Sequence, residues 1–167
     1  MSISTLVVGG GIGGLSLACE LALRKLPVTV LEKAPKSVPV GAGIIMNPNA
    51  MRVLERNGLA PALRAQSWPY LQRETADRRG RTLALRDYSP LYEAGKLARG
   101  ALVHRAHLHD VLYSGVPQGV VRFSSSVRKI NLLEEKIQAT TERGETCSPP
   151  SGATSASGWR RAGWTGR

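Results

Sequence analysis

Residues 3–14 read ISTLVVGGGIGG, an apolar run that leads straight into a cluster of glycines. The run at 3–8 predicts a β-strand, and the glycines have the spacing G-x-G-x-x-G at Gly9, Gly11 and Gly14. In this motif the first glycine permits a sharp turn off the strand, and the second lets the backbone approach a pyrophosphate. The third lets a helix pack close to the sheet. The stretch therefore predicts a strand, a tight turn and the start of a helix.

The next two segments complete a βαβ unit. Residues 13–24 have helical character, and Pro27 stops the helix from continuing. A second apolar run at 28–32 ends in Glu32, where an acid at the end of the second strand can accept hydrogen bonds from ribose hydroxyls. The free N–H groups at the start of the helix would face phosphates. A tight turn without a ligand is the alternative, but the strand, the helix and the acid together favour a dinucleotide site.

The composition is that of one globular domain with an excess of basic residues. The chain has 167 residues, with 23 Lys and Arg against 12 Asp and Glu, and a formal net charge of +11. This length is sufficient to bury a core. The basic residues are scattered rather than clustered among aromatic residues, which argues against a nucleic-acid partner. We find neither a signal peptide nor a transmembrane segment in the sequence, so we expect a cytoplasmic protein.

Neither the cysteines nor the histidines form a metal-binding pattern. Cys19 and Cys147 are far apart, and neither belongs to a C-x-x-C pair. His104 and His107 could share one face of a helix, but His109 would point elsewhere, and no carboxylate or cysteine completes a set. We therefore expect no metal site, and no Ser/His/Asp arrangement for nucleophilic catalysis is recognisable.

Periodicity and turn residues predict the remaining elements. Residues 36–49 are expected to form a long loop, and loops of that length inside a compact domain are more often functional than not. We expect Asn49 to cap a helix and Gly58 to end it. The predicted helices lie at about 50–57, 61–64 and 106–113, and the predicted strands at about 71–75, 81–85, 120–123, 127–132 and 136–141.

Two further stretches carry information beyond the glycine turn. The segment 40–50 contains G-A-G-I followed by P-N-A, and Arg105 and Leu108 form an R-x-x-L pattern where a strand passes into a helix. Together with the turn and Glu32, these stretches resemble the FAD-dependent aromatic-ring monooxygenases of the para-hydroxybenzoate hydroxylase type. The likeness is closest to the salicylate-, urate- and hydroxynicotinate-hydroxylating members. It covers about residues 3–146 in the right order.

The resemblance implies an α/β fold with a Rossmann-like FAD-binding domain, a parallel sheet and a small β-meander. The FAD-binding domain would occupy residues 1–146, with the first hairpin of an incomplete substrate domain inserted at about 70–88. A complete member of this family uses NAD(P)H to reduce FAD and hydroxylates a small aromatic substrate with O₂. The cofactor expected here is therefore FAD, with NAD(P)H as the reductant.

The resemblance also implies which residues hold FAD. The glycines would lie against the pyrophosphate, Glu32 would bind the adenosine ribose, and Lys33 would lie beside it. The loop around Ile45 would pass close to the flavin, Arg105 would reach the cofactor, and the backbone at Val127 would contact the adenine end. The alternatives are that Lys33 is an ordinary exposed residue, Ile45 and Val127 are plain core, and Arg105 pairs with an acid. The full set is Gly9, Gly11, Gly13, Gly14, Glu32, Lys33, Ile45, Arg105 and Val127.

The family pattern breaks at residue 147. Where the family has an apolar strand that leads into G-A-D-G, residues 148–151 read Ser-Pro-Pro-Ser, and two consecutive prolines cannot serve a central parallel strand. We therefore expect a truncated reading of a longer gene, in which 147–167 is a disordered or out-of-frame tail. The missing strand would leave an apolar sheet edge open and lower stability, and truncation leaves open whether the chain is an active enzyme.

Two other functions remain open from the sequence. One is a Rossmann protein that binds NAD(P) without a flavin at the same glycine turn. The other is a non-catalytic basic module whose charge recruits an anionic partner. Bound oxidised flavin is yellow and NAD(P) is not, so a visible spectrum separates the first of these from a flavoprotein.

Overall fold

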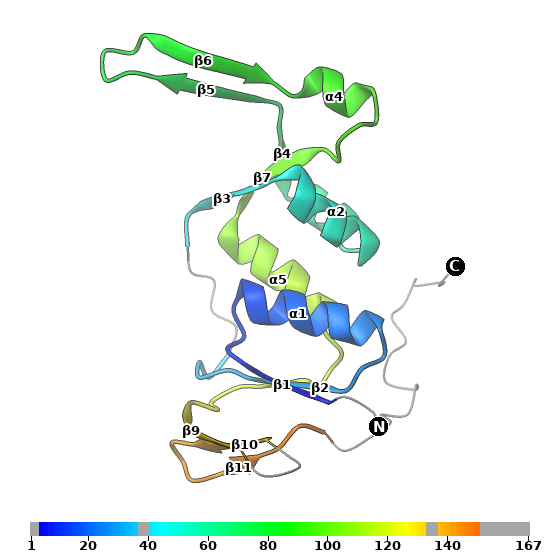
Figure 1. The fold of residues 1–167 in the computed structure, drawn as a ribbon, viewed down its shortest axis with the longest axis vertical. Coiled ribbons are helices and arrows are strands. Elements are labelled where there is room, and N and C mark those ends of the chain that lie inside the picture. Colours follow the sequence, from blue (N-terminus) through cyan, green and yellow to red (C-terminus); the bar gives the residue numbers. More distant parts are fainter. Residues whose placement is uncertain (1–3, 37–40, 133–136, 151–167) are drawn as a thin grey trace. The chain divides into compact units, whose positions relative to one another are not determined.

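The computed structural model describes residues 4–36, 41–132 and 137–150 (Figure 1). They fall into two compact units: the first takes its described residues from Met1–Pro39 and His109–Arg167, and the second from Val40–Leu108. The mixed α/β class predicted from the sequence is confirmed. No helix within the described ranges is long and apolar enough to cross a membrane.

The first unit is built on a parallel sheet in the order β1–β2–β8. Helix α1 connects β1 to β2 along the chain. All four residues of β2 are buried, as expected of a strand that is covered on both faces. Helix α1 buries Leu15, Ala18, Cys19 and Ala22. The predicted βαβ unit is therefore present, with the bounds β1 Thr5–Val8, α1 Ile12–Leu23, β2 Val28–Leu31 and β8 Val121–Arg122.

A small antiparallel meander covers the face of this sheet opposite to helix α1 (Figure 1). Leu31 of β2 forms a buried cluster with Ala139 and Cys147, against which Leu6 and Val127 pack. The predicted meander is confirmed, but the sequence missed its third strand, which contains Cys147. The bounds are β9 Val127–Leu132, β10 Ile137–Thr141 and β11 Thr146–Cys147.

Two parts of the meander region predicted from the sequence lie outside the described residues. They are the connection between the predicted strands at 127–132 and 136–141, and residues 151–167 of the expected tail. Cys147, which the sequence placed at the start of that tail, is buried in β11. Among the described strands of the parallel sheet, β2 alone pairs with β1, and the open sheet edge expected from the sequence stays a prediction.

The second unit contains a three-stranded antiparallel sheet in the order β3–β7–β4. Helices α2 and α3 supply its core with Met51, Leu54 and Leu63. The cap predicted at Asn49 is wrong, because Asn47 is the N-cap of α2 and Pro48 opens the helix. Gly58 has the positive φ of +68° that suits the residue after a helix, as predicted. The bounds are β3 Gly43–Met46, α2 Pro48–Arg56, α3 Ala60–Arg64, β4 Ser67–Tyr70 and β7 Gly100–His104.

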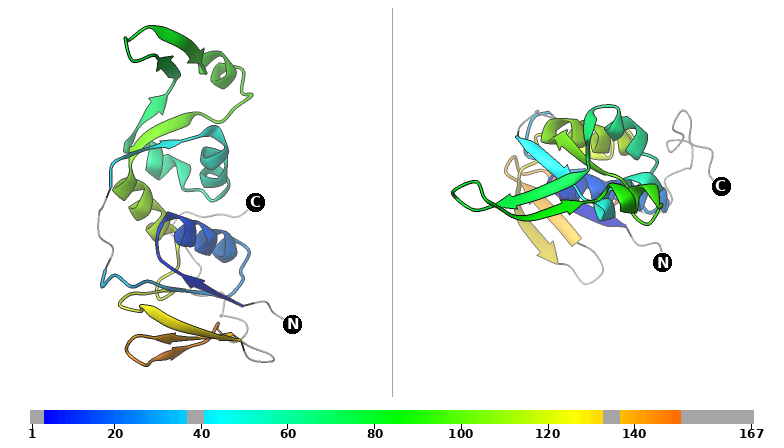
Figure 2. Two further views of the ribbon diagram at one scale, coloured as in Figure 1. Left: turned by 60° about the vertical axis from the view of Figure 1, so that its left-hand side comes forward. Right: turned by 90° about the horizontal axis from the view of Figure 1, so that it is seen from above.

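A long hairpin, β5 (Gln72–Ala76) with β6 (Thr82–Asp87), extends from this unit as a two-stranded ribbon (Figure 2). All residues of both strands are exposed. Its turn is held by Asp77, whose carboxylate accepts hydrogen bonds from the backbone N–H groups of Arg79 and Arg81. The predicted hairpin is confirmed within two residues at each end. The short helix α4 (Ser89–Glu93) follows it.

Helix α5 (Arg105–Gly115) follows β7, as predicted, and runs from the second unit into the first. Three elements of the second unit differ from the sequence-based expectation. The expected loop at 36–49 contains β3, and β4 and α4 were not predicted. Each is four or five residues long, and β3 and β4 exist because each pairs with β7. Such pairing is invisible in a local sequence window.

Candidate functional site

The glycine turn is closed by backbone contacts, which at Gly14 leave no room for a side chain. Gly9 has a φ of +102°, and its N–H donates to the carbonyl of Leu31 at 2.8 Å, which ties the turn to the end of β2. A Cβ added at Gly14 would lie 1.9 Å from the carbonyl oxygen of Gly9. Helix α1 therefore approaches the strand as closely as a glycine allows.

The first turn of α1, by contrast, has an open side. A Cβ added at Gly11 or Gly13 would meet no atom within 4 Å. Gly11 is the N-cap of the helix and has no side chain to satisfy the free N–H groups. Free N–H groups, the positive end of the helix dipole and open space together match the needs of a pyrophosphate. The residues present at the turn therefore fit a dinucleotide.

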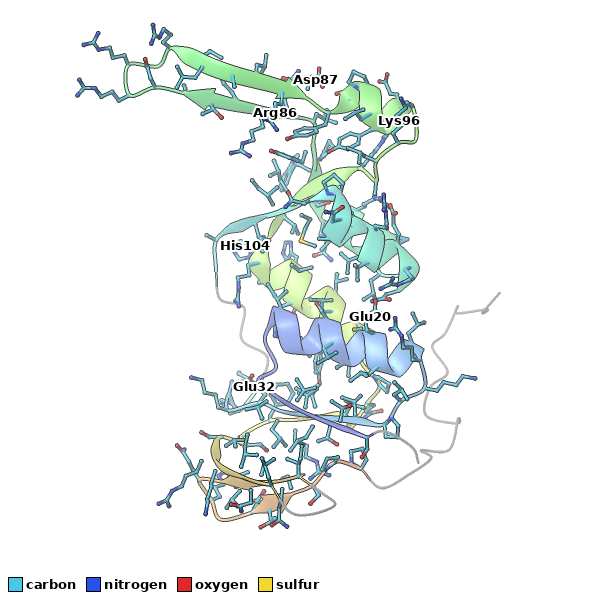
Figure 3. All side chains as sticks on the ribbon, viewed as in Figure 1. Glu20, Glu32, Arg86, Asp87, Lys96 and His104 are labelled. Atoms are coloured by element: carbon cyan, nitrogen blue, oxygen red, sulfur yellow. The ribbon has the colours of Figure 1, made fainter. Side chains whose placement is uncertain are left out.

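Glu32 lies at the end of β2, beside the junction of β1 with α1 (Figure 3). One carboxylate oxygen accepts the N–H of Gly10 at 2.5 Å, and the other accepts the N–H of Ala34 at 2.8 Å. A carboxylate offers about four lone-pair sites, so both oxygens retain capacity for a hydroxyl donor. Lys33 follows directly and is exposed.

His109 is a functional candidate that the sequence reasoning considered only as a metal ligand. Its Nε2 lies 2.8 Å from the carbonyl oxygen of Gly10, so a side chain of α5 contacts the glycine turn. Ninety-nine positions separate the two residues, and no motif in the sequence links them.

The three histidines do not gather with acids or cysteines among the described residues. The rings of His104 and His107 lie near each other, with centroids 5.7 Å apart. No group of three or more His, Cys, Asp or Glu side chains that could hold an ion occurs in the part of the chain that the structure describes.

In the second unit, the G-A-G segment lies against Arg105. Gly41 has a φ of +137°, and a Cβ there would lie 2.8 Å from Cδ of Arg105. The backbone N–H of Arg105 donates to the carbonyl of Ala42 at 3.0 Å. The glycine therefore makes space for the arginine stem.

Ile45 belongs to an exposed apolar row on the sheet of the second unit. It pairs with Leu102, which pairs in turn with Trp68 on β4. Ile45 is 50% exposed and Trp68 72% exposed. Ile45 is therefore not a core residue in this structure.

Val127 has a different environment in the first unit. It is half-buried and packs against the cluster of Leu31, Ala139 and Cys147. Its side chain is thus part of the contact between the meander and the parallel sheet, which agrees with the core alternative for the side chain. A contact of its backbone with adenine stays a prediction.

Comparison with known proteins gives a family match over most of the chain. The family model described as "FAD binding domain" matches residues 2–151. A 3-amino-4-hydroxybenzoate 2-monooxygenase of Streptomyces platensis is 39% identical over 145 residues, which cover 82% of this chain and 34% of the relative. Salicylate hydroxylase of Pseudomonas putida is 32% identical over 142 residues, which cover 79% of this chain and 31% of the relative.

Solved structures agree on the fold. HpxO of Klebsiella pneumoniae, in complex with FAD and uric acid, superposes with a TM-score of 0.71 at 23% identity, over 86% of this chain and 36% of that one. p-Nitrophenol 4-monooxygenase of Pseudomonas putida superposes with a TM-score of 0.73 at 21% identity, over 87% of this chain and 38% of that one. The family resemblance, the Rossmann-like fold and FAD as the family's cofactor are confirmed. The chain spans about a third of the length of the curated relatives that it matches.

Proposed function

The chain belongs to the FAD binding domain family, and on that premise we propose that it is the FAD-binding portion of a flavoprotein monooxygenase that hydroxylates an aromatic ring. The observation that carries the proposal is the turn at Gly9–Gly14. It is sealed on the strand side and open at Gly11 and Gly13, with the Glu32 carboxylate hydrogen-bonded to it.

The first unit would bind the adenosine half of FAD. The N–H groups at the open side of α1 would donate to the pyrophosphate at Gly11, Gly13 and Gly14, and the turn at Gly9 would keep them in place. The free lone pairs of Glu32 would accept the ribose hydroxyls, and the exposed Lys33 would lie beside them. The backbone at Val127 is the proposed contact of the adenine end.

The second unit would contact the cofactor through two residues. Gly41 leaves space for the stem of Arg105, whose guanidinium could then pair with a phosphate oxygen. Ile45 presents an exposed apolar side chain that suits a flavin ring. Bound FAD, reduced by NAD(P)H, supplies the chemistry that activates oxygen, and the protein groups bind and orient the cofactor.

The proposed substrate is a small aromatic acid that carries a hydroxyl group. The relatives in Streptomyces platensis and Pseudomonas putida are named for aminohydroxybenzoate and salicylate. The substrate, the reductant and hydroxylation are properties of a complete enzyme of this type. The chain spans about a third of the length of the Streptomyces platensis relative, so catalysis by the chain itself is part of the proposal. A cytoplasmic location also stays a prediction.

Titration of the purified chain with FAD tests the proposal. We expect saturable binding that perturbs the visible absorbance of the flavin, with NAD(P) unable to replace it. Glu32→Gln should weaken FAD binding by about tenfold or more, because an amide cannot accept from two N–H donors and a ribose at once. Glu142→Gln, a change at an exposed acid of the first unit, is the matched control and should bind normally. Preference for NAD(P) over FAD would refute the proposal.

A second step asks for chemistry. NAD(P)H consumption by the FAD-loaded chain should be followed with a panel of hydroxylated benzoates and nicotinates. Stimulation by one member of the panel would assign the substrate class. Consumption that no aromatic acid changes would restrict the proposal to cofactor binding.

A further inference from the structure

Gly10 of the glycine turn is held through both of its backbone polar groups, which belong to two successive peptides. The N–H of Gly10 donates to Glu32, and the carbonyl of Gly10 accepts from His109. The two side chains come from the end of β2 and from α5, which lie 22 and 99 positions away in the chain. Gly10 itself is buried, so these contacts replace water at a site where unpaired backbone groups would be costly.

The role of the imidazole follows from its partner. A carbonyl oxygen has no proton to give, so Nε2 of His109 must carry the hydrogen and donate it. The ring therefore donates to the turn in the manner of a backbone N–H group.

Helix α5 holds His109 in this position. One helical turn further on, the carbonyl of Leu112 accepts a hydrogen bond from the thiol of Cys19 on α1 at 3.3 Å. Leu112 is 2% exposed and Cys19 is 4% exposed. Residues three apart lie on one face of a helix, so the face that packs on α1 is the face that presents His109 to the turn.

The contact determines the direction of a neighbouring donor. The peptide between Gly10 and Gly11 is planar and trans, so its carbonyl and the N–H of Gly11 point in opposite directions. When His109 holds the carbonyl of Gly10, the N–H of Gly11 points away from that carbonyl. Gly11 is also a residue at which the turn is open, since a Cβ there would meet no atom within 4 Å. Glycines otherwise sample many conformations, and their ordering on binding would cost affinity.

We propose that His109 is a positioning residue: it pre-orients the Gly10–Gly11 peptide, while Glu32 holds the preceding Gly9–Gly10 peptide, so that the Gly11 N–H is ready to donate to the cofactor pyrophosphate. The inference rests on the proposed function for its ligand. The contact itself is a property of the ligand-free chain, so the two can fail separately.

The test compares three variants. His109→Leu removes the donor and keeps bulk, whereas His109→Gln places an amide N–H near the position of Nε2. His107→Leu is the matched control, because it changes an exposed histidine two residues earlier on the same helix. Circular dichroism and thermal melts establish that each variant is folded.

Two readouts are needed. In the ligand-free chain, NMR should show a shifted Gly11 amide resonance and a Gly10 amide that exchanges about five- to tenfold faster in His109→Leu. FAD binding should weaken by about tenfold in that variant. His109→Gln should restore most of both properties, and His107→Leu should change neither.

The outcomes separate the two hypotheses. FAD binding by His109→Leu at the wild-type affinity, or His109→Gln that is no better than His109→Leu, overturns the positioning role. A wild-type chain that binds no FAD defeats the proposed function, yet the amide measurements still decide whether His109 holds the turn. Should His109→Leu fail to fold, the comparison of His109→Gln with the wild type carries the test, and a loss of FAD binding in folded His109→Gln overturns the role.

Discussion

The two strand pairs β1–β2 and β5–β6 differ in what covers them. Every residue of β2 is buried, between α1 on one face and the meander on the other. Every residue of β5 and β6 is exposed, including Leu83 at 60% and Leu85 at 62%. A two-stranded hairpin alone has marginal stability in water. The comparison teaches that the parallel sheet of the first unit is covered on both faces by its own helix and meander, whereas the hairpin depends on its hydrogen bonds and turn.

The largest effect is expected from Gly14→Ala. The new methyl group would lie 1.9 Å from the carbonyl oxygen of Gly9, so α1 must move away from β1, at a cost of several kcal/mol. We expect loss of the cooperative thermal transition and of FAD binding. Gly13→Ala is the control, since its methyl group enters open space. It should fold normally and lose FAD affinity alone. A stable Gly14→Ala would contradict the packing described for the turn.

Truncating one leucine in each strand pair directly compares how much each contributes to the free energy of unfolding. Leu31→Ala removes a side chain that is 1% exposed and contacts the meander, so we expect a loss of about 2–5 kcal/mol in the free energy of unfolding. Leu83→Ala on the hairpin should change it by less than about 0.5 kcal/mol. Urea denaturation measures both. Equal losses would mean that the hairpin is covered in solution, which would contradict the difference in burial between the two strand pairs.

The exposed leucines of the hairpin should govern solubility rather than stability. Contiguous exposed apolar groups promote association, so the double variant Leu83→Thr with Leu85→Thr should aggregate less at the same melting temperature. Light scattering during heating measures the difference. Thr75→Ser, at an exposed residue of β5, is the control. Unchanged aggregation would show that the apolar row Ile45–Leu102–Trp68 or the β1 edge is responsible instead.

The smallest effect concerns Asp87 at the end of the hairpin. The backbone N–H of Ser89 donates to its carboxylate at 2.9 Å, and this hydrogen bond lowers the pKa of Asp87 below its ordinary value of 3.8. Because the pKa is lowered in the folded state, the charged carboxylate stabilises the start of α4 when the pH is above the ordinary pKa of Asp87. This contribution is lost as the pH falls through the lowered pKa. An NMR titration should find a pKa below 3.8, and an unshifted value would remove the proposed link between the hairpin and α4.

The sequence predicted the parts of the fold that local signals encode. The glycine turn, the βαβ unit and the hairpin each have residues whose conformational preferences act within a few positions, such as Gly9 and Gly80 with their positive φ angles. The acid at Glu32 was found because its spacing from the glycines belongs to a known motif. The structure then supplied its actual partners, the N–H groups of Gly10 and Ala34.

The sequence could not predict features created by distant contacts. Strand β4 contains Pro69, which disfavours a strand, yet it pairs at the sheet edge with β7, where a proline is tolerated. Cys147 looked like the start of a polar tail, but the cluster around Leu31 and Ala139 buries it. His109 attracted attention only as a metal ligand, since nothing local reveals that it contacts Gly10.

The most direct test of the account is a calorimetric titration of the purified chain with FAD and, separately, with FMN. FMN has the flavin and lacks the adenosine half that the first unit is proposed to bind. We predict saturable binding of FAD at one site, displacement of FAD by ADP, and no measurable binding of FMN. Binding of FMN as tight as that of FAD, or FAD binding that ADP leaves unchanged, would contradict the claim that the glycine turn and Glu32 hold the cofactor.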